Sequence, residues 1–175
     1  SIIQQVNALQ LKQLFIPGHP MAGKETTGFQ SATATLFNQA PYFLVKQQPA
    51  VYNEFKLFLQ KWSVNIIEIE PSQHDLLVAH LSHIPYLTAS ALTQIAVAMA
   101  DVSIVKQSYG PGFKDSTRVA SSSPQWGEDV CKHNKEAVLK GITDLINTLT
   151  DYKQDIENNH ITALGAKLEQ TKQWR

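Results

Sequence analysis

The order of apolar and polar residues changes character near Pro71. Before this point, short apolar runs at 14–16, 42–45 and 64–70 have the length and residue types of buried strands. Between the last two runs, apolar residues recur at helical spacing, which predicts a strand–helix–strand unit and a mainly parallel sheet. This stripe consists of Val51, Phe55, Phe58, Leu59 and Trp62. Residues 2–13 are also predicted to be helical.

After Pro71 the pattern is helical to the end of the chain. Ser72 with Asp75 predicts a capping box, and Pro85 is expected to kink or break the helix that this box opens. A second helix is expected to reach about Gln107, followed by a turn over 109–112. Ser123 and Pro124 predict the start of a long helix. Its apolar face consists of Val130, Ala137, Val138, Ile142, Leu145, Ile146 and Leu149, and a last helix carries Ile161, Leu164 and Leu168.

This pattern predicts two domains, an α/β region over 1–70 and an all-α region over 71–175. Long amphipathic helices in about 100 residues cannot bury all their apolar faces within one chain. Pairing with a second copy would cover the remainder. We therefore expect a homodimer formed through the residues after Pro71.

Composition narrows the function classes. Fifteen basic and fifteen acidic residues give a net charge of zero, which argues against binding to nucleic acid or to an anionic membrane. The apolar stretch at 87–100 is too short and too polar to span a bilayer. Cys131 is the only cysteine, so an internal disulfide is impossible and a reducing compartment fits best. We expect a cytoplasmic protein.

The segment 18–25, Gly-His-Pro-Met-Ala-Gly-Lys-Glu, follows an apolar run and nearly matches a phosphate-binding P-loop. Glu25 stands where that motif needs a magnesium-binding hydroxyl, and its carboxylate would repel a triphosphate. Pro20 removes a backbone N–H that should contact phosphate. A nucleotide hydrolase is therefore disfavoured.

The same segment resembles the His-Pro-Met-Ala-Gly active-site loop of the prephenate dehydrogenase family. Further motifs agree in the same order: His74-Asp75, then 82–85 (Ser-His-Ile-Pro), then 112–120 (Gly-Phe-Lys-Asp-Ser-Thr-Arg-Val-Ala), then Ser123-Pro124 with Trp126. The tryptophan stands one place earlier than in the family pattern. This resemblance extends over nearly the whole chain.

The resemblance implies a fold and an activity. The fold would be the remnant of a Rossmann-type domain followed by a helical dimerisation domain like the C-terminal domain of 6-phosphogluconate dehydrogenase. The activity would be NAD- or NADP-dependent oxidative decarboxylation of prephenate to 4-hydroxyphenylpyruvate, a step of tyrosine biosynthesis. Arogenate is the alternative substrate, and a non-catalytic dimerisation or regulatory module is the alternative function.

The family's Gly-x-Gly-x-x-Gly fingerprint is absent from this sequence. We therefore expect the main dinucleotide site, on the order of a hundred residues, to lie upstream of Ser1. By itself the chain is expected neither to bind NAD(P) tightly nor to turn over substrate. The choice between NAD and NADP would be made in that upstream part.

The resemblance also assigns residues. His19 would be catalytic, accepting the hydrogen bond of the substrate hydroxyl as hydride leaves the same carbon; otherwise it is a loop histidine bonded to backbone. Arg118, one of two arginines beside thirteen lysines, would hold a substrate carboxylate, or else pair structurally with Asp115 or Glu25. The remaining assignments are substrate contacts for His74, His83 and Tyr86, supporting roles for Glu25, Asp115, Gly112 and Trp126, and cofactor contacts for Pro20 and Gly23.

Two of these points stay open in the sequence. His74 and His83 can equally be satisfied histidines at a helix interface, and His74, His80 and His83 do not converge on one helix face as metal ligands would. Several family members carry histidine at the position of Tyr86. Because tyrosine offers a hydrogen bond but no charge, the choice between prephenate and arogenate remains undecided.

Overall fold

The computed structural model describes residues 2–10, 14–24, 26, 28–46 and 50–175. It contains two compact units, 1–138 and 139–175. The elements of the first unit are α1 (Ile2–Ala8), β1 (Gly18–Pro20), the 3-10 turn η1 (Phe29–Ser31), β2 (Pro41–Val45), α2 (Ala50–Gln60), β3 (Asn65–Ile69), α3 (Pro71–Val78), the π turn η2 (Ala79–His83), α4 (Ile84–Met99), α5 (Val102–Ser108), α6 (Pro111–Thr117), the 3-10 turn η3 (Arg118–Ser121) and α7 (Pro124–His133). Helix α8 (Lys135–Glu157) begins in the first unit and continues into the second, which ends with α9 (Ile161–Trp174).

In the described part of the chain, three strands form one mixed sheet in the order β1-β2-β3. Strands β2 and β3 are parallel and are joined by α2, so the predicted strand–helix–strand unit is confirmed. Strand β1 runs antiparallel to β2, with His19 opposite Phe43. The sheet is therefore not mainly parallel, because the added strand reverses direction.

The first strand lies later than the sequence pattern predicts. Residues 14–16 are not in a strand, and β1 is instead formed by the motif segment itself. A backbone hydrogen bond from Val45 N to Pro17 O, 3.0 Å long, begins this pairing. Gly18 permits it, because a Cβ there would lie 2.7 Å from Cε1 of Tyr42 on the neighbouring strand. The prediction of a buried strand at 14–16 was wrong: Leu14 and Phe15 are exposed, and strand pairing depends on the partner strand rather than on an apolar run alone.

The core of the α/β region lies between β2 and α2. Leu44, Tyr52 and Leu59 form it, each less than 5% exposed. The stripe predicted for α2 is only partly buried, since Val51, Phe58 and Trp62 remain 45–50% exposed. Tyr52 is buried instead, with its hydroxyl donating a 3.0 Å hydrogen bond to Glu68 on β3.

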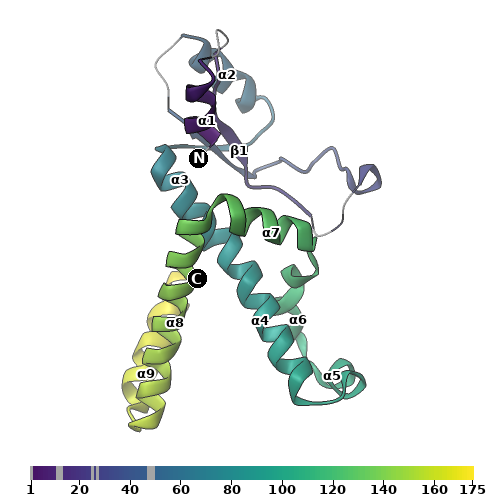
Figure 1. Ribbon diagram of the computed structural model, residues 1–175, viewed down its shortest axis with the longest axis vertical. Helices are drawn as coiled ribbons and strands as arrows, with labels where there is room; N and C mark the ends of the chain where they lie inside the picture. The colour runs from purple at the N-terminus through teal and green to yellow at the C-terminus, as the bar shows by residue number, and fades with distance from the viewer. Residues whose placement is uncertain (1, 11–13, 25, 27, 47–49) are drawn as a thin grey trace. The chain divides into compact units, whose positions relative to one another are not determined.

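Helix α3 starts at Pro71, with Glu70 in the cap position, so the predicted cap at Ser72 is wrong. Proline suits a first helical turn because its fixed φ is already helical and its missing N–H is not needed there. Pro85 does not end the helix either. The π turn η2 lies before it, and Pro85 falls in the first turn of α4, so the chain continues from α3 into α4 (Figure 1). Such wide turns accommodate a missing backbone donor.

Two other predicted helices are divided. The helix expected to reach Gln107 ends at Met99, and Asp101 caps α5 by accepting a 2.7 Å hydrogen bond from Ser103 N. The turn expected over 109–112 ends early, because α6 already begins at Pro111. The helix that starts after Ser123 is confirmed, but it breaks at Asn134, where the backbone leaves the helical region. These breaks follow from local capping and tertiary contacts that an apolar stripe does not record.

The second unit is a helical hairpin of α8 and α9. Lys167 on α9 donates to Asp151 at 2.5 Å and to Asp155 at 2.6 Å, both on α8. Asp155 is 8% exposed. Ile146, Leu149, Ile156, Ile161 and Leu168 of the same unit are more than half exposed. This unit therefore presents apolar side chains that its own two helices do not cover.

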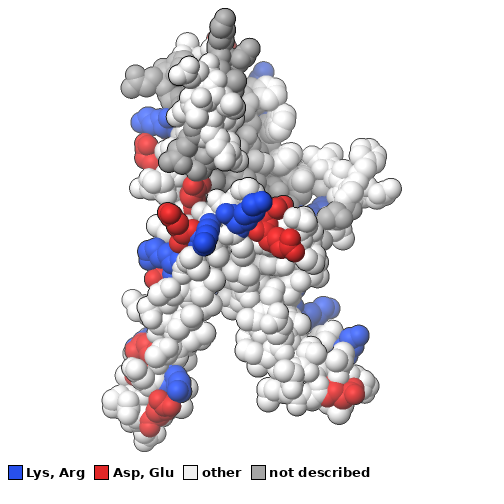
Figure 2. Space-filling view, viewed as in Figure 1, with Lys and Arg blue, Asp and Glu red and all other residues white. Residues whose placement is uncertain are grey.

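Figure 2 shows acidic and basic side chains intermingled on one face, with uncharged surface between them. Among the described residues, no single helix is long and apolar enough to cross a membrane; one strongly bent pair, 71–99 with 102–108, reaches the threshold of length and composition.

Candidate active site

Two histidines from distant parts of the chain form a hydrogen-bonded pair. His19 lies on β1, and its Nδ1 is 2.9 Å from Nε2 of His74 on α3. Their ring centroids are 5.1 Å apart. The edge of the Phe43 ring packs against His74 at 5.6 Å, with the two planes at 88°. Phe43 is the cross-strand partner of His19, so the sheet register fixes where the side chains of His19 and Phe43 lie along their strands.

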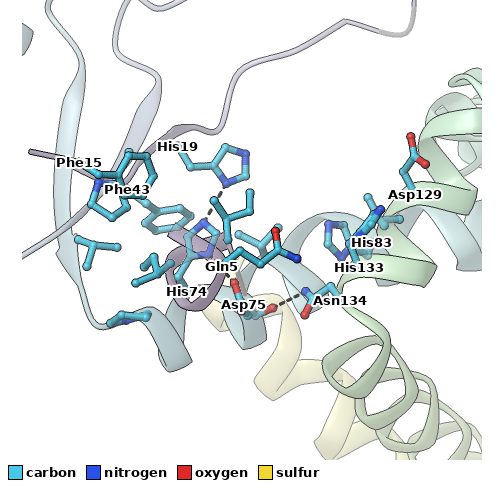
Figure 3. A pocket seen from close by; sticks show the side chains of 18 residues that line it. Gln5, Phe15, His19, Phe43, His74, Asp75, His83, Asp129, His133 and Asn134 are labelled. Carbon is cyan, nitrogen blue, oxygen red and sulfur yellow. Dashed lines mark hydrogen bonds and ion pairs between the residues drawn. The ribbon is translucent and has the colours of Figure 1, made fainter. Parts of the chain in front are cut away.

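The pair continues to a carboxylate. His74 Nδ1 lies 2.9 Å from Oδ1 of Asp75. The side-chain amide of Asn134 donates a 2.7 Å hydrogen bond to the backbone carbonyl of Asp75. Asn134 lies at the break between α7 and α8. Its hydrogen bond therefore connects the end of α7 to the series of contacts that runs from His19 through His74 to Asp75 (Figure 3).

A third histidine lies in the π turn. His83 is 6% exposed, and its Nδ1 is buried with no hydrogen-bond partner among the described residues. Its ring meets Trp126 at 5.8 Å. An unpaired buried polar atom lowers the stability of the folded protein, so it is uncommon away from functional sites, and π turns also occur often at such sites. A hydrogen-bonding ligand would satisfy this nitrogen.

The electrostatics keep two of these rings neutral. Burial lowers the pKa of His19 below its ordinary value of 6.5, and the neighbouring His74 lowers it further. Burial likewise lowers the pKa of His83, with smaller contributions from His19 and His74 that outweigh the opposing effect of Asp75. At neutral pH both imidazoles can therefore accept a hydrogen bond through one ring nitrogen.

These side chains surround one cavity of about 650 Å³ in the first unit (Figure 3). Phe15, Phe43, Val45, Val78 and Val130 supply apolar walls, with α1 adding Ile2 and Ile3. The polar lining consists of Gln5, His19, His74, Asp75, His83, Asp129, His133 and Asn134. A mostly apolar cavity of this volume with a few convergent polar groups is typical of a small-molecule site.

Of the residues singled out in the sequence, His19, His74 and His83 lie together in this cavity. Tyr86 and Trp126 form an edge-to-face pair at 5.1 Å and pack behind it, outside the described lining. Pro20 ends β1, and Gly23 is exposed in the loop that follows. Glu25 is outside the described residues.

The arginine loop also lies outside the described cavity lining. Arg118 opens η3 and is exposed, as are Asp115 and Gly112 on α6. No lysine or arginine is among the described lining residues. Any role of Arg118 toward a ligand in the cavity therefore stays a proposal.

The sequence reasoning missed the contribution of α7. Asp129 and His133 line the cavity from this helix, and Asn134 follows them. Their spacing of four residues places the first two on one helix face. Within the described residues, no three His, Cys, Asp or Glu side chains are grouped as a metal site.

The glycines give no dinucleotide cradle. Gly110 and Gly112 form a Gly-x-Gly pair, but they open α6 after another helix rather than after a strand. A pyrophosphate site of the Rossmann type needs the strand–turn–helix context. Among the described residues, these glycines therefore form no pyrophosphate site of the Rossmann type.

The α/β region and the helical region each match a model of one dehydrogenase family. Residues 70–170 match the family model "Prephenate dehydrogenase, dimerization domain", and residues 1–68 match "Prephenate dehydrogenase, nucleotide-binding domain". The chain belongs to the prephenate dehydrogenase family. Both regions anticipated from the motifs, the α/β remnant and the helical dimerisation domain, are thereby confirmed.

Similar proteins agree with this assignment. Prephenate dehydrogenase of Bacillus subtilis is 29% identical over 92% of this chain and 44% of its own length. Cyclohexadienyl dehydrogenase of Zymomonas mobilis is 27% identical over 85% of this chain and 53% of its own length. The chain thus spans about half the length of the curated relatives that it matches.

Solved structures show the same arrangement. Synechocystis arogenate dehydrogenase has a TM-score of 0.79 at 32% identity, covering 94% of this chain and 62% of that one. Prephenate dehydrogenase of Aquifex aeolicus, in complex with hydroxyphenyl propionate and NAD+, has a TM-score of 0.77 at 29% identity, covering 90% and 57%. These two relatives carry different substrate names, so the likeness leaves the substrate undecided.

Proposed function

We propose that the complete gene product containing this chain is a prephenate dehydrogenase. It would oxidise the ring carbinol of prephenate with NAD or NADP and release the ring carboxylate as carbon dioxide. The observation that carries the proposal is the neutral, half-buried His19, fixed by His74 at the wall of a cavity sized for a small molecule. This chain would supply the substrate side of the site.

His19 would accept the hydrogen bond of the substrate hydroxyl. As hydride leaves the same carbon, the hydroxyl proton becomes acidic, and His19 would take it while the carbonyl forms. The bond between the ring and its carboxylate then breaks, and its electron pair completes the aromatic ring. Aromatisation drives this second step, so the protein needs to provide orientation and one proton acceptor.

The carboxylates of the substrate need partners. His83 would donate to or accept from the ligand through its unpaired Nδ1, which supports a direct contact. Arg118 would bind a carboxylate through its guanidinium fork. The absence of lysine and arginine from the described cavity lining supports a need for a cation supplied from outside it.

Arogenate is the second candidate substrate, and one observation favours it. Asp75 and Asp129 both line the cavity, and a carboxylate there would attract the side-chain ammonium group that distinguishes arogenate from prephenate. Tyr86, in place of the histidine of several family members, removes one potential cation. Prephenate remains our proposal because its keto acid side chain suits neutral histidine donors.

Steady-state kinetics of the complete gene product with each substrate and each dinucleotide tests both candidates. A higher kcat/KM for prephenate supports the proposal, and a higher value for arogenate replaces it with the second candidate. Turnover of neither substrate would favour the alternative of a non-catalytic dimerisation module. Asp129→Asn should lower kcat/KM for arogenate more than for prephenate if the carboxylate selects the ammonium group.

A further inference from the structure

The hydrogen bonds from Asp75 through His74 to His19 have a definite direction. A carboxylate only accepts hydrogen bonds, so His74 must donate to it from Nδ1 across their 2.9 Å separation. The other nitrogen of a neutral His74 then carries a lone pair. It can only accept, and its partner 2.9 Å away is Nδ1 of His19. His19 must therefore be protonated at Nδ1, which leaves its lone pair on Nε2.

This arrangement opposes the intrinsic preference of histidine. A free neutral imidazole side chain favours the proton on Nε2, the tautomer that would block His19 as an acceptor on that nitrogen. The remaining titratable groups that line the cavity are His83, Asp129 and His133, and none of them is hydrogen-bonded to His19 or His74 among the described residues. The fixed negative charge that sets the direction is therefore that of Asp75.

We propose that His74 and Asp75 are positioning residues that hold His19 in the Nδ1-protonated tautomer, with the Nε2 lone pair available to a ligand hydroxyl. As a statement about the reaction, this rests on the proposed function; as a statement about the tautomer, it does not. When His19 Nε2 receives the hydroxyl proton, its Nδ1–H continues to donate to His74, so the ring keeps its orientation through the step. The arrangement resembles a histidine–aspartate pair with a second imidazole inserted.

The rest of the fold supports these two residues. Phe43 packs edge-on against the His74 ring, which restricts its rotation. Asn134 holds the backbone carbonyl of Asp75 at 2.7 Å and so fixes the first turns of α3 relative to the end of α7. Each contact limits the movement of one residue in the hydrogen-bonded series Asp75–His74–His19. His19 is therefore oriented before any ligand binds.

Nitrogen NMR of this chain, labelled with 15N-histidine, tests the tautomer directly and needs neither substrate nor cofactor. Two-bond proton–nitrogen correlations at a pH above the titration range distinguish the two tautomers of each ring. We expect Nδ1–H at both His19 and His74 in the native sequence. Asp75→Asn and His74→Phe should shift His19 toward Nε2–H, whereas the control Glu54→Gln, an exposed carboxylate on α2, should leave it unchanged.

An Nε2–H tautomer of His19 in the native chain would overturn the proposal, and this readout does not depend on any variant folding. An unchanged His19 tautomer in a folded Asp75→Asn would overturn it equally. In the complete enzyme, Asp75→Asn should lower kcat by about ten- to a hundredfold with little change in KM, a part of the roughly 100- to 10,000-fold that a positioned base supplies. Asp75→Glu should recover part of the loss, which a merely structural defect would not show. If the tautomer is as expected but the complete protein shows no turnover, the proposed function fails while the positioning of His19 stands.

Discussion

The side chain of Asn134 is bonded to the backbone of Asp75, a residue 59 positions earlier in the chain. The contact joins the end of α7 to the first turns of α3, beside the histidine pair. It involves a backbone carbonyl, so it depends on the position of the helix rather than on the identity of the residue there. The site therefore depends on a hydrogen bond that none of the sequence motifs predicts.

Replacing Asn134 by aspartate should destabilise the first unit. The carboxylate has the same shape but cannot donate to a carbonyl, so the partly buried acceptor loses its partner. A lost hydrogen bond of this kind amounts to about 0.5–1.5 kcal/mol of the free energy of unfolding. Urea denaturation checks this, with Asn147→Asp on the exposed part of α8 as the control. Equal stability of the two variants would contradict the anchoring role.

Gly127→Ala should destabilise the protein through a clash with Tyr86. A Cβ at this buried glycine would lie 2.7 Å from Tyr86 Cε1, and the Tyr86 ring is held by Trp126. Overpacking of this kind amounts to about 1–3 kcal/mol. Gly165→Ala is the matched control, because nothing lies within 4 Å of its added Cβ and alanine favours a helix by about 1 kcal/mol. The unfolding temperature should therefore fall for Gly127→Ala and rise for Gly165→Ala. Adding Tyr86→Leu should restore part of the stability that Gly127→Ala loses.

The free energy of unfolding should fall between about pH 10 and pH 12 because of Tyr52. Burial, and then the hydrogen bond to Glu68, raise the pKa of Tyr52 to about 12. A raised folded-state pKa gives stability that is complete below the unfolded value of about 10 and is lost as pH rises through the folded value. Two pKa units correspond to about 2–3 kcal/mol. Denaturation of the native chain and Tyr52→Phe across this range checks it, since lysine titration is common to both. A constant difference between the two would contradict the assignment.

In the complete enzyme, His19 and Arg118 should affect different kinetic constants. His19→Asn should mainly lower kcat, because its hydrogen bond strengthens as the hydroxyl becomes a carbonyl. Arg118→Ala should mainly raise KM by about ten- to a hundredfold, since the carboxylate is already present when substrate binds, and Arg118→Lys should recover little. An unchanged KM in Arg118→Ala would leave Arg118 with a structural role only.

The pH dependence of kcat/KM should reflect His19. Its pKa is lowered by burial and by His74, and the protonated ring cannot accept a hydrogen bond. Activity should therefore be complete near neutral pH and fall only as pH drops below 6.5. His74→Phe should move this fall to higher pH, because the neighbour that helps to lower the pKa is removed. If kcat/KM of the native enzyme and of His74→Phe fell at the same pH, a group other than His19 would control the loss of activity at low pH.

Light scattering should give a molar mass twice the 19.5 kDa of one chain. The family model over 70–170 is that of a dimerization domain, and Ile146 and Leu149 on α8 are each more than half exposed. Replacing both by glutamate should lower the dimer fraction if α8 contributes to the interface. Thr150→Glu, an exposed charge on the same helix, is the control. A monomer in the native chain at micromolar concentration would contradict the prediction.

The sequence by itself determined the family, the strand–helix–strand unit and the helical character after Pro71, and it singled out His19, His74 and His83, which all line the cavity. These features depend on apolar periodicity and on short motifs, both of which are local. It could not place β1, because Gly18 pairs only where Tyr42 and Val45 of another strand allow it. Nor could it show that Pro85 follows a π turn instead of ending the helix.

Only the tertiary structure decided which residues meet in the cavity. His19 and His74 are 55 positions apart, and the sheet register together with the start of α3 brings their rings to hydrogen-bond distance. The same folding put Asp129 and His133 at the cavity and left Tyr86 and Arg118 outside its described lining. Motifs name residue types, but the direction of a side chain follows from the packing of the element that carries it.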